Sequence, residues 1–373
     1  MRLLDRELLN SMFVLDSHCD TPSQILRLRD LSLDNELAHV DYPKLKRGNV
    51  DGAFFALYIP AALNTDDAKD YLLRLMGGVR RTLAENADKA TLTVSMSQAV
   101  ENKKNGLFSL FLGLENGSPL GDSDDAFEIL SKLYDAGVRY MTLCHSRSNQ
   151  ICDSCASQTP KWGGLSPFGK RLVAEMNRIG MLVDVSHISD SAFYDVLSCS
   201  TKPVVATHSS CRALAAHPRN MTDDMIRELA ARGGVIQINF YPVFLDSKFA
   251  SRLSSSDIAE RGESIEAEFI ADPSNEAKRQ AWNSVQRELL AFERPSYKLI
   301  ADHIDHVVSL VGVDHVGIGS DYDGIEITPD GMEDISMMPK LFEELRSRGY
   351  SEEDLAKIAG GNFFRVMEQV AQI

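Results

Sequence analysis

Apolar and polar positions along the chain alternate between two kinds of segment. Short apolar runs rich in β-branched residues and bounded by turn residues predict eight strands, at 13–18, 50–59, 107–115, 138–145, 181–187, 203–209, 234–241 and 314–321. Between most of them lie segments with helical periodicity, at 66–88, 124–136, 168–180, 189–199 and 221–232. Strands that alternate with helices are typical of a parallel sheet, so the pattern predicts an α/β protein with a (β/α)8 TIM barrel.

Two stretches depart from this alternation. Residues 245–310 are charged and helix-prone, and we interpret them as a helical insertion before the last strand. Residues 337–372 predict two C-terminal helices divided near 349–353, where Ser351 suits a helix N-cap. No internal repeat and no Pro/Gly/Ser-rich linker divides the chain, so we expect residues 1–373 to form a single domain.

The composition excludes several classes of protein. Of the 373 residues, 44% are hydrophobic and 25% are charged, which is typical of a globular protein. The formal net charge of −15 argues against nucleic acid and anionic membranes as partners, because both select basic surfaces. The first residues have acid where a signal peptide needs an apolar core, and no apolar run approaches transmembrane length. We therefore expect a cytoplasmic protein, or a periplasmic one if a leader has been removed.

Six cysteines at irregular spacings do not predict a disulfide framework. Cys152 and Cys155 form one C-x-x-C pair, for which structural zinc or redox chemistry is the alternative. Because neither a second pair nor a βαβ context accompanies them, we interpret both as ordinary loop thiols.

Ionisable side chains gather where the predicted strands end. In a barrel of this type the catalytic groups project from the C-terminal ends of the strands, because the βα loops there form the open face. These strand ends carry His18, Asp20, Glu115, His145, His187, His208 and Asp321, and they include four of the nine histidines. Imidazole and carboxylate groups hold zinc while leaving a position open for water, so the set predicts a catalytic metal site.

Each of these residues also has a simpler interpretation when it is taken alone. His18 and Asp20 share a strand face because they are two residues apart, and either could be a solvated loop residue. His187 could be a satisfied core histidine, and Glu115 could form a structural ion pair at the end of its apolar strand. Their convergence with His208 favours the metal site, in which the two oxygens of Glu115 could bridge two cations.

An ordered series of motifs resembles the membrane dipeptidase (renal dipeptidase) family, peptidase family M19 within the amidohydrolase-like barrels. The series covers nearly the whole chain and consists of Asp16-Ser-His18-Cys-Asp20, Gly113-Leu-Glu115-Asn-Gly117, Leu143-Cys-His145, Gly164-Leu-Ser-Pro-Phe-Gly169, Val183-Asp-Val-Ser-His187, His208-Ser-Ser, Arg219-Asn220, Gly317-Ile-Gly-Ser-Asp321-Tyr-Asp323-Gly324 and Gly360-Gly-Asn-Phe363. Three features depart from the family pattern, and one of them is Thr21-Pro22, where Leu-Pro is commoner. Cys19 stands where relatives often have Asn, and Phe244 lies in a segment where vertebrate relatives tend to have another tyrosine, which leaves the substrate preference open.

The resemblance implies a dinuclear zinc centre, with two Zn²⁺ per chain. His18 and Asp20 would hold one ion, His187 and His208 would hold the other, and Glu115 would bridge both. Two cations lower the pKa of a shared water far below its bulk value, so the resemblance implies a bridging hydroxide as the nucleophile.

The resemblance also implies roles for three further residues. His145 would polarise the scissile carbonyl and stabilise the oxyanion, and Asp321 would carry the proton to the leaving amine. Arg219 would bind the terminal carboxylate of the substrate, which explains a preference for dipeptides over proteins. The corresponding alternatives are a core histidine, a strand-end cap and a surface ion pair.

We therefore predict a zinc-dependent dipeptidase that hydrolyses small dipeptides, including those with a C-terminal D-residue. Another dinuclear metallohydrolase of the same barrel, such as a lactonase or a deacylase, is the main alternative. A non-catalytic metal-binding protein is the third hypothesis. Loss of Arg219 separates the first two, because only a dipeptidase needs to bind a terminal carboxylate. A homodimer is the expected assembly, since relatives often form one.

Overall fold

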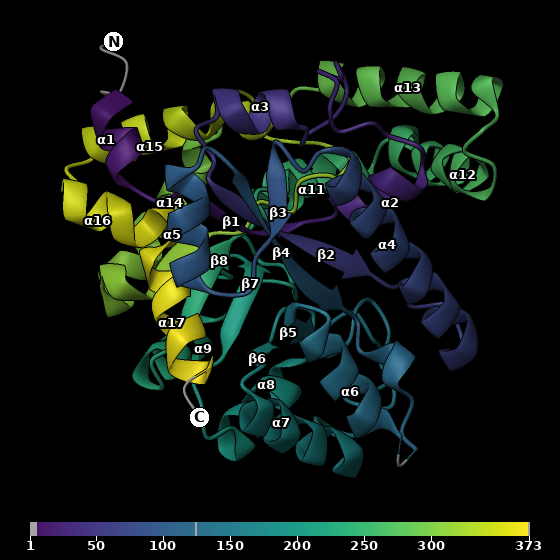
Figure 1. Cartoon of the computed structure of the whole chain (residues 1–373), viewed down its shortest axis with the longest axis vertical. Helices are drawn as coiled ribbons and strands as arrows, with labels where there is room; N and C mark the ends of the chain where they lie inside the picture. The colour runs from purple at the N-terminus through teal and green to yellow at the C-terminus, as the bar shows by residue number, and fades with distance from the viewer. Residues whose placement is uncertain (1–5, 124, 372–373) are drawn as a thin grey trace.

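A barrel of parallel strands surrounded by helices forms the centre of the computed structural model, which describes residues 6–123 and 125–371 (Figure 1). The strands are β1 (Leu15–Cys19), β2 (Gly52–Tyr58), β3 (Ala90–Leu92), β4 (Phe108–Glu115), β5 (Val138–Thr142), β6 (Leu182–Asp184), β7 (Val205–Ser209), β8 (Val235–Ile238) and β9 (Val316–Ile318). The strand order β1-β2-β4-β5-β6-β7-β8-β9 is parallel throughout, and a parallel bridge between Cys19 and Tyr322 joins its two ends. The predicted TIM barrel is confirmed.

The eight predicted strands are the eight strands of the barrel, although several of them are shorter than predicted. β5 ends at Thr142 and β6 at Asp184, so His145 and His187 lie in the loops that follow rather than on the strands. β3, which the sequence pattern did not predict, pairs only with β4 and lies outside the barrel. Its three residues are too few to give a periodic signal.

The helices between the strands begin at residues that cap them. The part of the chain before β8 contains α1 (Arg6–Ser11), α2 (Thr21–Leu26), α3 (Tyr42–Arg47), α4 (Thr65–Glu85), α5 (Met96–Lys104), α6 (Ala126–Asp135), α7 (Pro167–Ile179), α8 (Asp190–Cys199) and α9 (Asp223–Ala231). Ser166, Ser189 and Thr222 each accept a hydrogen bond from a backbone N–H in the first turn of α7, α8 and α9. These caps fix where the βα loops end, and the same loops carry the side chains of the open face.

α10 (Pro242–Leu245) precedes the predicted helical insertion, which contains α11 (Ser247–Ser254), α12 (Asp257–Ala271), α13 (Glu276–Ala291) and α14 (Lys298–Val311). α12 packs against α13 around an apolar cluster of their own, to which Trp282 belongs. α14 instead packs against α9 and β9, so it serves as the barrel helix between β8 and β9. The segment that departs from the barrel pattern is therefore α11 to α13, shorter than the range predicted from the sequence.

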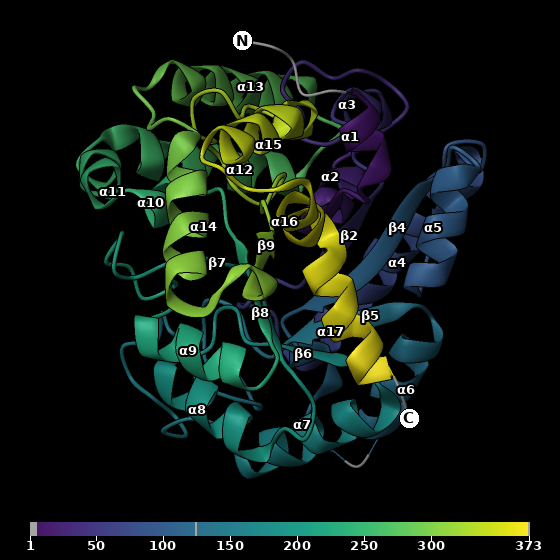
Figure 2. The ribbon, with the colours of Figure 1, turned by 90° about the vertical axis from the view of Figure 1, so that its left-hand side faces the viewer.

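The C-terminal helices close the end of the barrel that lies opposite the βα loops. They are α15 (Met338–Ser347), α16 (Glu352–Ala356) and α17 (Asn362–Ala371). Ser351 and Asp354 form a capping box at the start of α16, as the position of Ser351 in the sequence indicated. Figure 2 shows α17 lying across this end of the barrel, where Phe363 and Phe364 join the interior cluster of strand residues such as Phe54.

The six cysteines all lie within the described residues and are free thiols. Cys152 is buried and Cys155 is half-buried in the loop between β5 and α7. Among residues 6–123 and 125–371, no helix has both the length and the apolar character needed to cross a bilayer.

A buried histidine in α14 makes the stability of the fold depend on pH. His303 is only 1% exposed, its Nδ1 accepts a hydrogen bond from the Cys211 backbone N–H at 3.0 Å, and burial lowers its pKa from 6.5 to about 4. A proton therefore binds the unfolded state more tightly, so the contribution of neutral His303 is complete above pH 6.5 and is lost as the pH falls towards 4. The loss is on the order of 3 kcal/mol.

Urea unfolding of the wild type and of His303→Gln at pH 7.5 and pH 5 tests this prediction. Nε2 of His303 also lies 3.3 Å from the Leu245 carbonyl oxygen. A glutamine amide has an acceptor and a donor for these two partners but does not titrate, so the unfolding free energy of His303→Gln should fall less between the two pH values. Equal pH dependence in both proteins would contradict the prediction.

Candidate active site

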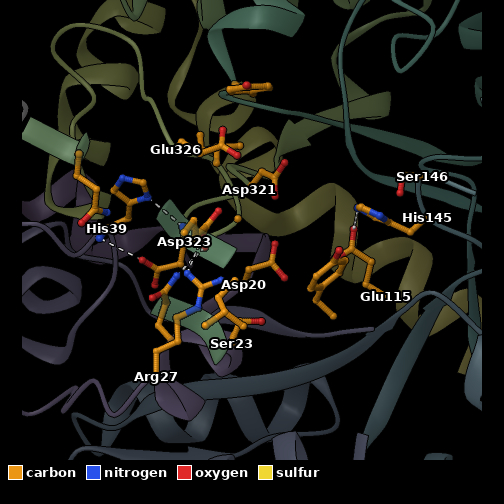
Figure 3. Close-up of a pocket in the computed structure, with 18 of the residues that line it drawn as sticks. Asp20, Ser23, Arg27, His39, Glu115, His145, Ser146, Asp321, Asp323 and Glu326 are labelled. Carbon is orange, nitrogen blue, oxygen red and sulfur yellow. Dashed lines mark hydrogen bonds and ion pairs between the residues drawn. The ribbon is translucent and has the colours of Figure 1, made fainter. Parts of the chain in front are cut away.

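A cavity of about 450 Å³ opens at the C-terminal ends of the barrel strands, and the residues singled out in the sequence surround it (Figure 3). Asp20, Glu115, His145, His187, Arg219 and Asp321 line the cavity. His18 and His208 are fully buried beside them, on β1 and β7. The fold thus brings together all eight side chains from segments that are far apart in the sequence.

Glu115, the last residue of β4, lies at the centre of this group. Its Oε1 is 3.1 Å from Nε2 of His187 and 3.4 Å from Nε2 of His208, while its Oε2 is 3.4 Å from Nε2 of His18. Nε2 of His18 is in turn 3.6 Å from Oδ2 of Asp20. The two carboxylate oxygens therefore face two different sets of ligand atoms.

Apart from the Nε2 atoms of His187 and His208, which lie 2.8 Å apart, these spacings are compatible with metal coordination. Two atoms bound at ~2.1 Å to one tetrahedral ion lie ~3.4 Å apart, close to the separations around Glu115. Nε2 of His18, Oδ1 of Asp20 and Oε2 of Glu115 are buried and have no hydrogen-bond partner among the described residues. Buried polar atoms without partners are costly, and divalent cations would satisfy all three.

Three groups of side chains each bring their potential ligand atoms within 4.8 Å of one another. They are His18 with Glu115 and His208, Glu115 with His145 and His187, and His18 with Asp20 and Asp321. His18 and Glu115 each belong to two of the groups, so the three groups form one continuous site with several potential metal ligands. His145 and Asp321, to which the resemblance gives other roles, are also within reach of it.

The protonation states that the protein favours suit cation binding. Burial and the neighbouring Arg219 guanidinium hold the pKa of His187 well below its usual value, and burial does the same for His208, so both rings are neutral. Burial opposes ionisation of Glu115, but the charge of His18 holds the pKa of that carboxyl well below its usual range. The Glu115 carboxylate likewise raises the pKa of His18 against the effect of burial. A cation that replaced the proton on His18 would pair with the same carboxylate.

The orientation of His18 depends on Tyr140 in β5. The Tyr140 hydroxyl lies 2.8 Å from Nδ1 of His18, which leaves Nε2 directed at Glu115. Gly113 makes this contact possible, because a Cβ at that position would lie 2.0 Å from the Tyr140 ring. Tyr140 was not predicted as a site residue, because a tyrosine within a buried strand is normally interpreted as part of the hydrophobic core.

Replacing Tyr140 by Phe is expected to lower metal affinity about 10- to 100-fold, because it removes the hydrogen bond that orients His18. Competition with a chromogenic chelator measures this affinity. Tyr194→Phe, at an exposed position on α8, is the matched control and should leave the affinity unchanged. Equal affinities for all three proteins would show that Tyr140 does not orient a ligand.

A buried carboxylate fixes His208 in a similar way. Oδ2 of Asp184 accepts hydrogen bonds from the hydroxyls of Thr142, at 2.5 Å, and Thr207, at 2.7 Å. Because the Thr207 hydroxyl donates to Asp184, its oxygen accepts from Nδ1 of His208 at 2.8 Å. The lone pair of His208 is thereby left on Nε2, which faces Glu115. Asp184 was not predicted as a site residue. The signal that could have identified it is an acidic residue within the apolar strand segment that precedes His187.

Two residues in the loops that follow strands have left-handed backbone conformations, which residues other than glycine rarely adopt. The φ angles are 70° at His187 and 65° at Asp321. Such conformations cost free energy and concentrate where a side chain must point in an unusual direction. Here they turn both side chains into the cavity.

Arg219 and Asp321 line the cavity beside the candidate metal ligands, where they could contact a bound molecule. Nη2 of Arg219 donates to the His208 carbonyl at 2.9 Å, and the guanidinium lies over the Phe244 ring at 5.3 Å. Among residues 6–123 and 125–371, no carboxylate lies within ion-pair distance of Arg219. Asp321 accepts a hydrogen bond from the Asn239 amide at 2.9 Å, and burial raises its pKa. The surface ion pair considered for Arg219 is therefore not present in the part of the chain that the structure describes.

Comparisons with known proteins identify a family to which the whole chain is similar. Residues 4–373 match the family model described as membrane dipeptidase (peptidase family M19). Dipeptidase verJ of Clonostachys rogersoniana is 33% identical over 98% of this chain and 86% of the relative, and dipeptidase aclJ of Aspergillus oryzae is 31% identical over 94% and 74%. These matches extend along almost the whole chain.

Solved structures resemble the fold as a whole. The probable dipeptidase PvdM from Pseudomonas aeruginosa has a TM-score of 0.80 and 27% identity, covering 98% of this chain and 97% of its own. A metallo peptidase from Rhodobacter sphaeroides, solved with a phosphinate mimic of the dipeptide L-Ala-D-Ala, has a TM-score of 0.77 and 23% identity, covering 96% and 99%.

Proposed function

The chain belongs to the membrane dipeptidase family, peptidase family M19, and from this membership we propose that it is a zinc-dependent dipeptidase with two Zn²⁺ per chain. Its general activity as a hydrolase acting on dipeptides follows from the family match and from its relatives, which are named dipeptidases. The observation that carries the proposal is the convergence of buried, unpartnered imidazole and carboxylate atoms around Glu115.

The proposed ligands divide into two pairs joined by one bridge. His18 and Asp20 would hold one ion, His187 and His208 would hold the other, and the Glu115 carboxylate would serve both. When bound, the two ions would lower the pKa of a shared water and supply a hydroxide nucleophile at neutral pH. Tyr140 and Asp184 keep the imidazoles in the orientation and tautomer that binding requires.

The other side chains hold the substrate and move its proton. Arg219 binds the terminal carboxylate, since its guanidinium borders the cavity without an acidic partner among the described residues. Burial lowers the pKa of His145, so its ring is neutral and can donate a hydrogen bond to the scissile carbonyl oxygen. Burial raises the pKa of Asp321, which suits a carboxyl that takes up a proton and delivers it to the leaving amine.

We also propose that dipeptides with a C-terminal D-residue are substrates. The Rhodobacter sphaeroides metallo peptidase was solved with a mimic of such a dipeptide, which supports the proposal by similarity of fold. The homodimer and the cytoplasmic location stay predictions.

Metal analysis combined with a dipeptide panel tests the proposed function. The zinc-loaded protein should hydrolyse L,L and L,D dipeptides, and a chelator should abolish the activity until zinc is restored. Metal analysis should give two zinc ions per chain, and less than one under replete conditions would contradict the dinuclear centre. Hydrolysis of lactones or acylated amines without any dipeptide hydrolysis would replace the proposal with the alternative metallohydrolase.

A further inference from the structure

A second cavity of about 350 Å³ adjoins the active-site cavity. It lies between the segment that follows α2, residues 27–38, and the helices α12 and α13 of the insertion. Both cavities are lined by Gln24, Arg27, Arg29, Leu37, Trp282 and Gln286, so the second continues from the first. We call this second cavity the α13 groove. The active-site cavity alone is large enough for a small dipeptide, so the α13 groove is not needed to bind the peptide backbone and is available to a longer side chain.

The inner walls of the groove are held in place by ion pairs and packing. Arg27 pairs with Glu266 of α12 at 2.7 Å, and Arg29 pairs with the buried carboxylate of Asp323 at 2.5 Å. Trp282 is only 5% exposed within the apolar cluster of α12 and α13. Because these contacts join the insertion to the barrel, the groove is a built feature of the fold.

The groove and Arg219 lie on different sides of the proposed metal ligands. Arg219 contacts β7 through the His208 carbonyl, whereas residues 27–38 follow β1 and α2. β8 and β9 separate β7 from β1 in the barrel. Figure 3 likewise shows His145 on one side of the cavity and Arg27 on the opposite side, with Asp20 between them. A dipeptide with its carboxylate at Arg219 therefore directs its N-terminal residue towards the groove.

The groove offers hydrogen-bonding groups rather than a net charge. Its arginines are neutralised by acidic partners, including Glu36, which lies 3.6 Å from Arg287. Asn283 and Gln286 lie on the same face of α13, and neither amide has a hydrogen-bond partner among the described residues. Leu37, with the small exposed part of Trp282, provides apolar surface beside them. Such a lining matches an aliphatic stem that ends in an uncharged polar group, because an apolar end would desolvate the amides without replacing their hydrogen bonds.

We propose that the α13 groove binds the side chain of the substrate's N-terminal residue and selects dipeptides in which that side chain is long and ends in an amide or similar polar group. The proposal rests on the proposed dipeptidase function and names the substrate class. Gln286 is its specificity-determining residue, because it lines both cavities and stands at the entrance from one to the other.

Steady-state kinetics with Gln-Ala, Met-Ala, Ala-Ala and Ala-Gln test the proposal. Wild type should prefer Gln-Ala to Met-Ala, which has a similar length but an apolar end. Gln286→Trp should fill the entrance and lower kcat/KM for Gln-Ala at least about tenfold, while Ala-Ala and Ala-Gln change by less than about twofold. Gln280→Trp, an exposed position on the same helix, is the matched control and should change none of the four.

Gln286→Leu provides a milder test that does not depend on tolerance of the larger side chain. It keeps the volume but removes the amide, so the preference for Gln-Ala over Met-Ala should disappear. Equal losses for Gln-Ala and Ala-Ala in Gln286→Trp, or a loss confined to Ala-Gln, would overturn the proposal while the dipeptidase function stands. Absence of hydrolysis of all four dipeptides by zinc-loaded wild type would instead overturn the proposed function and this proposal with it.

Discussion

Glu115→Gln is expected to lose tightly bound metal and to lower kcat/KM for dipeptides by roughly 10³-fold or more, since two cations together stabilise the transition state by several kcal/mol. The substitution keeps the shape of the side chain but removes the negative charge that faces both pairs of ligands. One amide oxygen remains as an acceptor, so at most one ion keeps its bond to residue 115. Metal content after dialysis against a weak chelator and steady-state kinetics measure the two effects separately.

The exposed glutamate of α6 supplies a matched control for this change. Glu128 forms a surface ion pair with Lys132 at 2.6 Å, and Glu128→Gln should leave both metal content and kcat/KM unchanged. Two zinc ions in Glu115→Gln, together with wild-type activity, would show that Glu115 does not bridge the metals. Circular dichroism spectra that match the wild type would exclude unfolding as the cause of a loss.

The barrel could be predicted because each of its strands and helices has a recognisable pattern within a short segment of the sequence. Each strand is a short apolar run, and each helix repeats its apolar positions with a period close to 3.6 residues. β3 escaped prediction because its partner β4 lies outside its own sequence window, and three residues carry little periodic signal. The ends of β5 and β6 were placed too late, because the apolar residues Leu143 and Val185 continue beyond the last residue that pairs with a neighbouring strand.

The gathering of the candidate ligands could be predicted because parallel strands in a barrel point their C-terminal ends to one face. That rule brings His18, Glu115 and His208 together without knowledge of any distance. It says nothing about groups that act through another side chain. Tyr140 reaches His18 only because Gly113 leaves room for its ring, and this depends on the register of two neighbouring strands. Sequence alone does not give that register.

The residues that line the outer part of the cavity were the least predictable part of the site. Residues 27–38 and the face of α13 around Gln286 are about 250 positions apart along the chain, and only the position of the insertion on the barrel brings them together. A charged, helix-prone segment such as 245–310 could equally have pointed away from the site. The side chains that select a substrate therefore had to be read from the structure.

Arg219→Ala is expected to lower kcat/KM for dipeptides roughly 10²-fold or more, because it leaves the carboxylate of the bound substrate without its ionic partner. Most of the effect should appear as a higher KM, since the carboxylate is present in the ground state as well as in the transition state. Arg219→Lys should recover only part of the loss, because an ammonium cannot offer the paired, planar donors of a guanidinium. Kinetics with Ala-Ala for the three proteins measure this series.

The amide of the same substrate separates carboxylate binding from a general effect on the site. Ala-Ala-NH₂ lacks the terminal charge, so wild type should hydrolyse it poorly and Arg219→Ala should lower its kcat/KM by less than about threefold. Arg227→Ala, at an exposed position on α9, is the control for loss of a positive charge far from the cavity. Equal losses for the acid and the amide would mean that Arg219 supports the loop after β7, through its hydrogen bond to the His208 carbonyl, rather than the substrate. A loss confined to the acid instead identifies Arg219 as the group that requires a free carboxylate in the substrate.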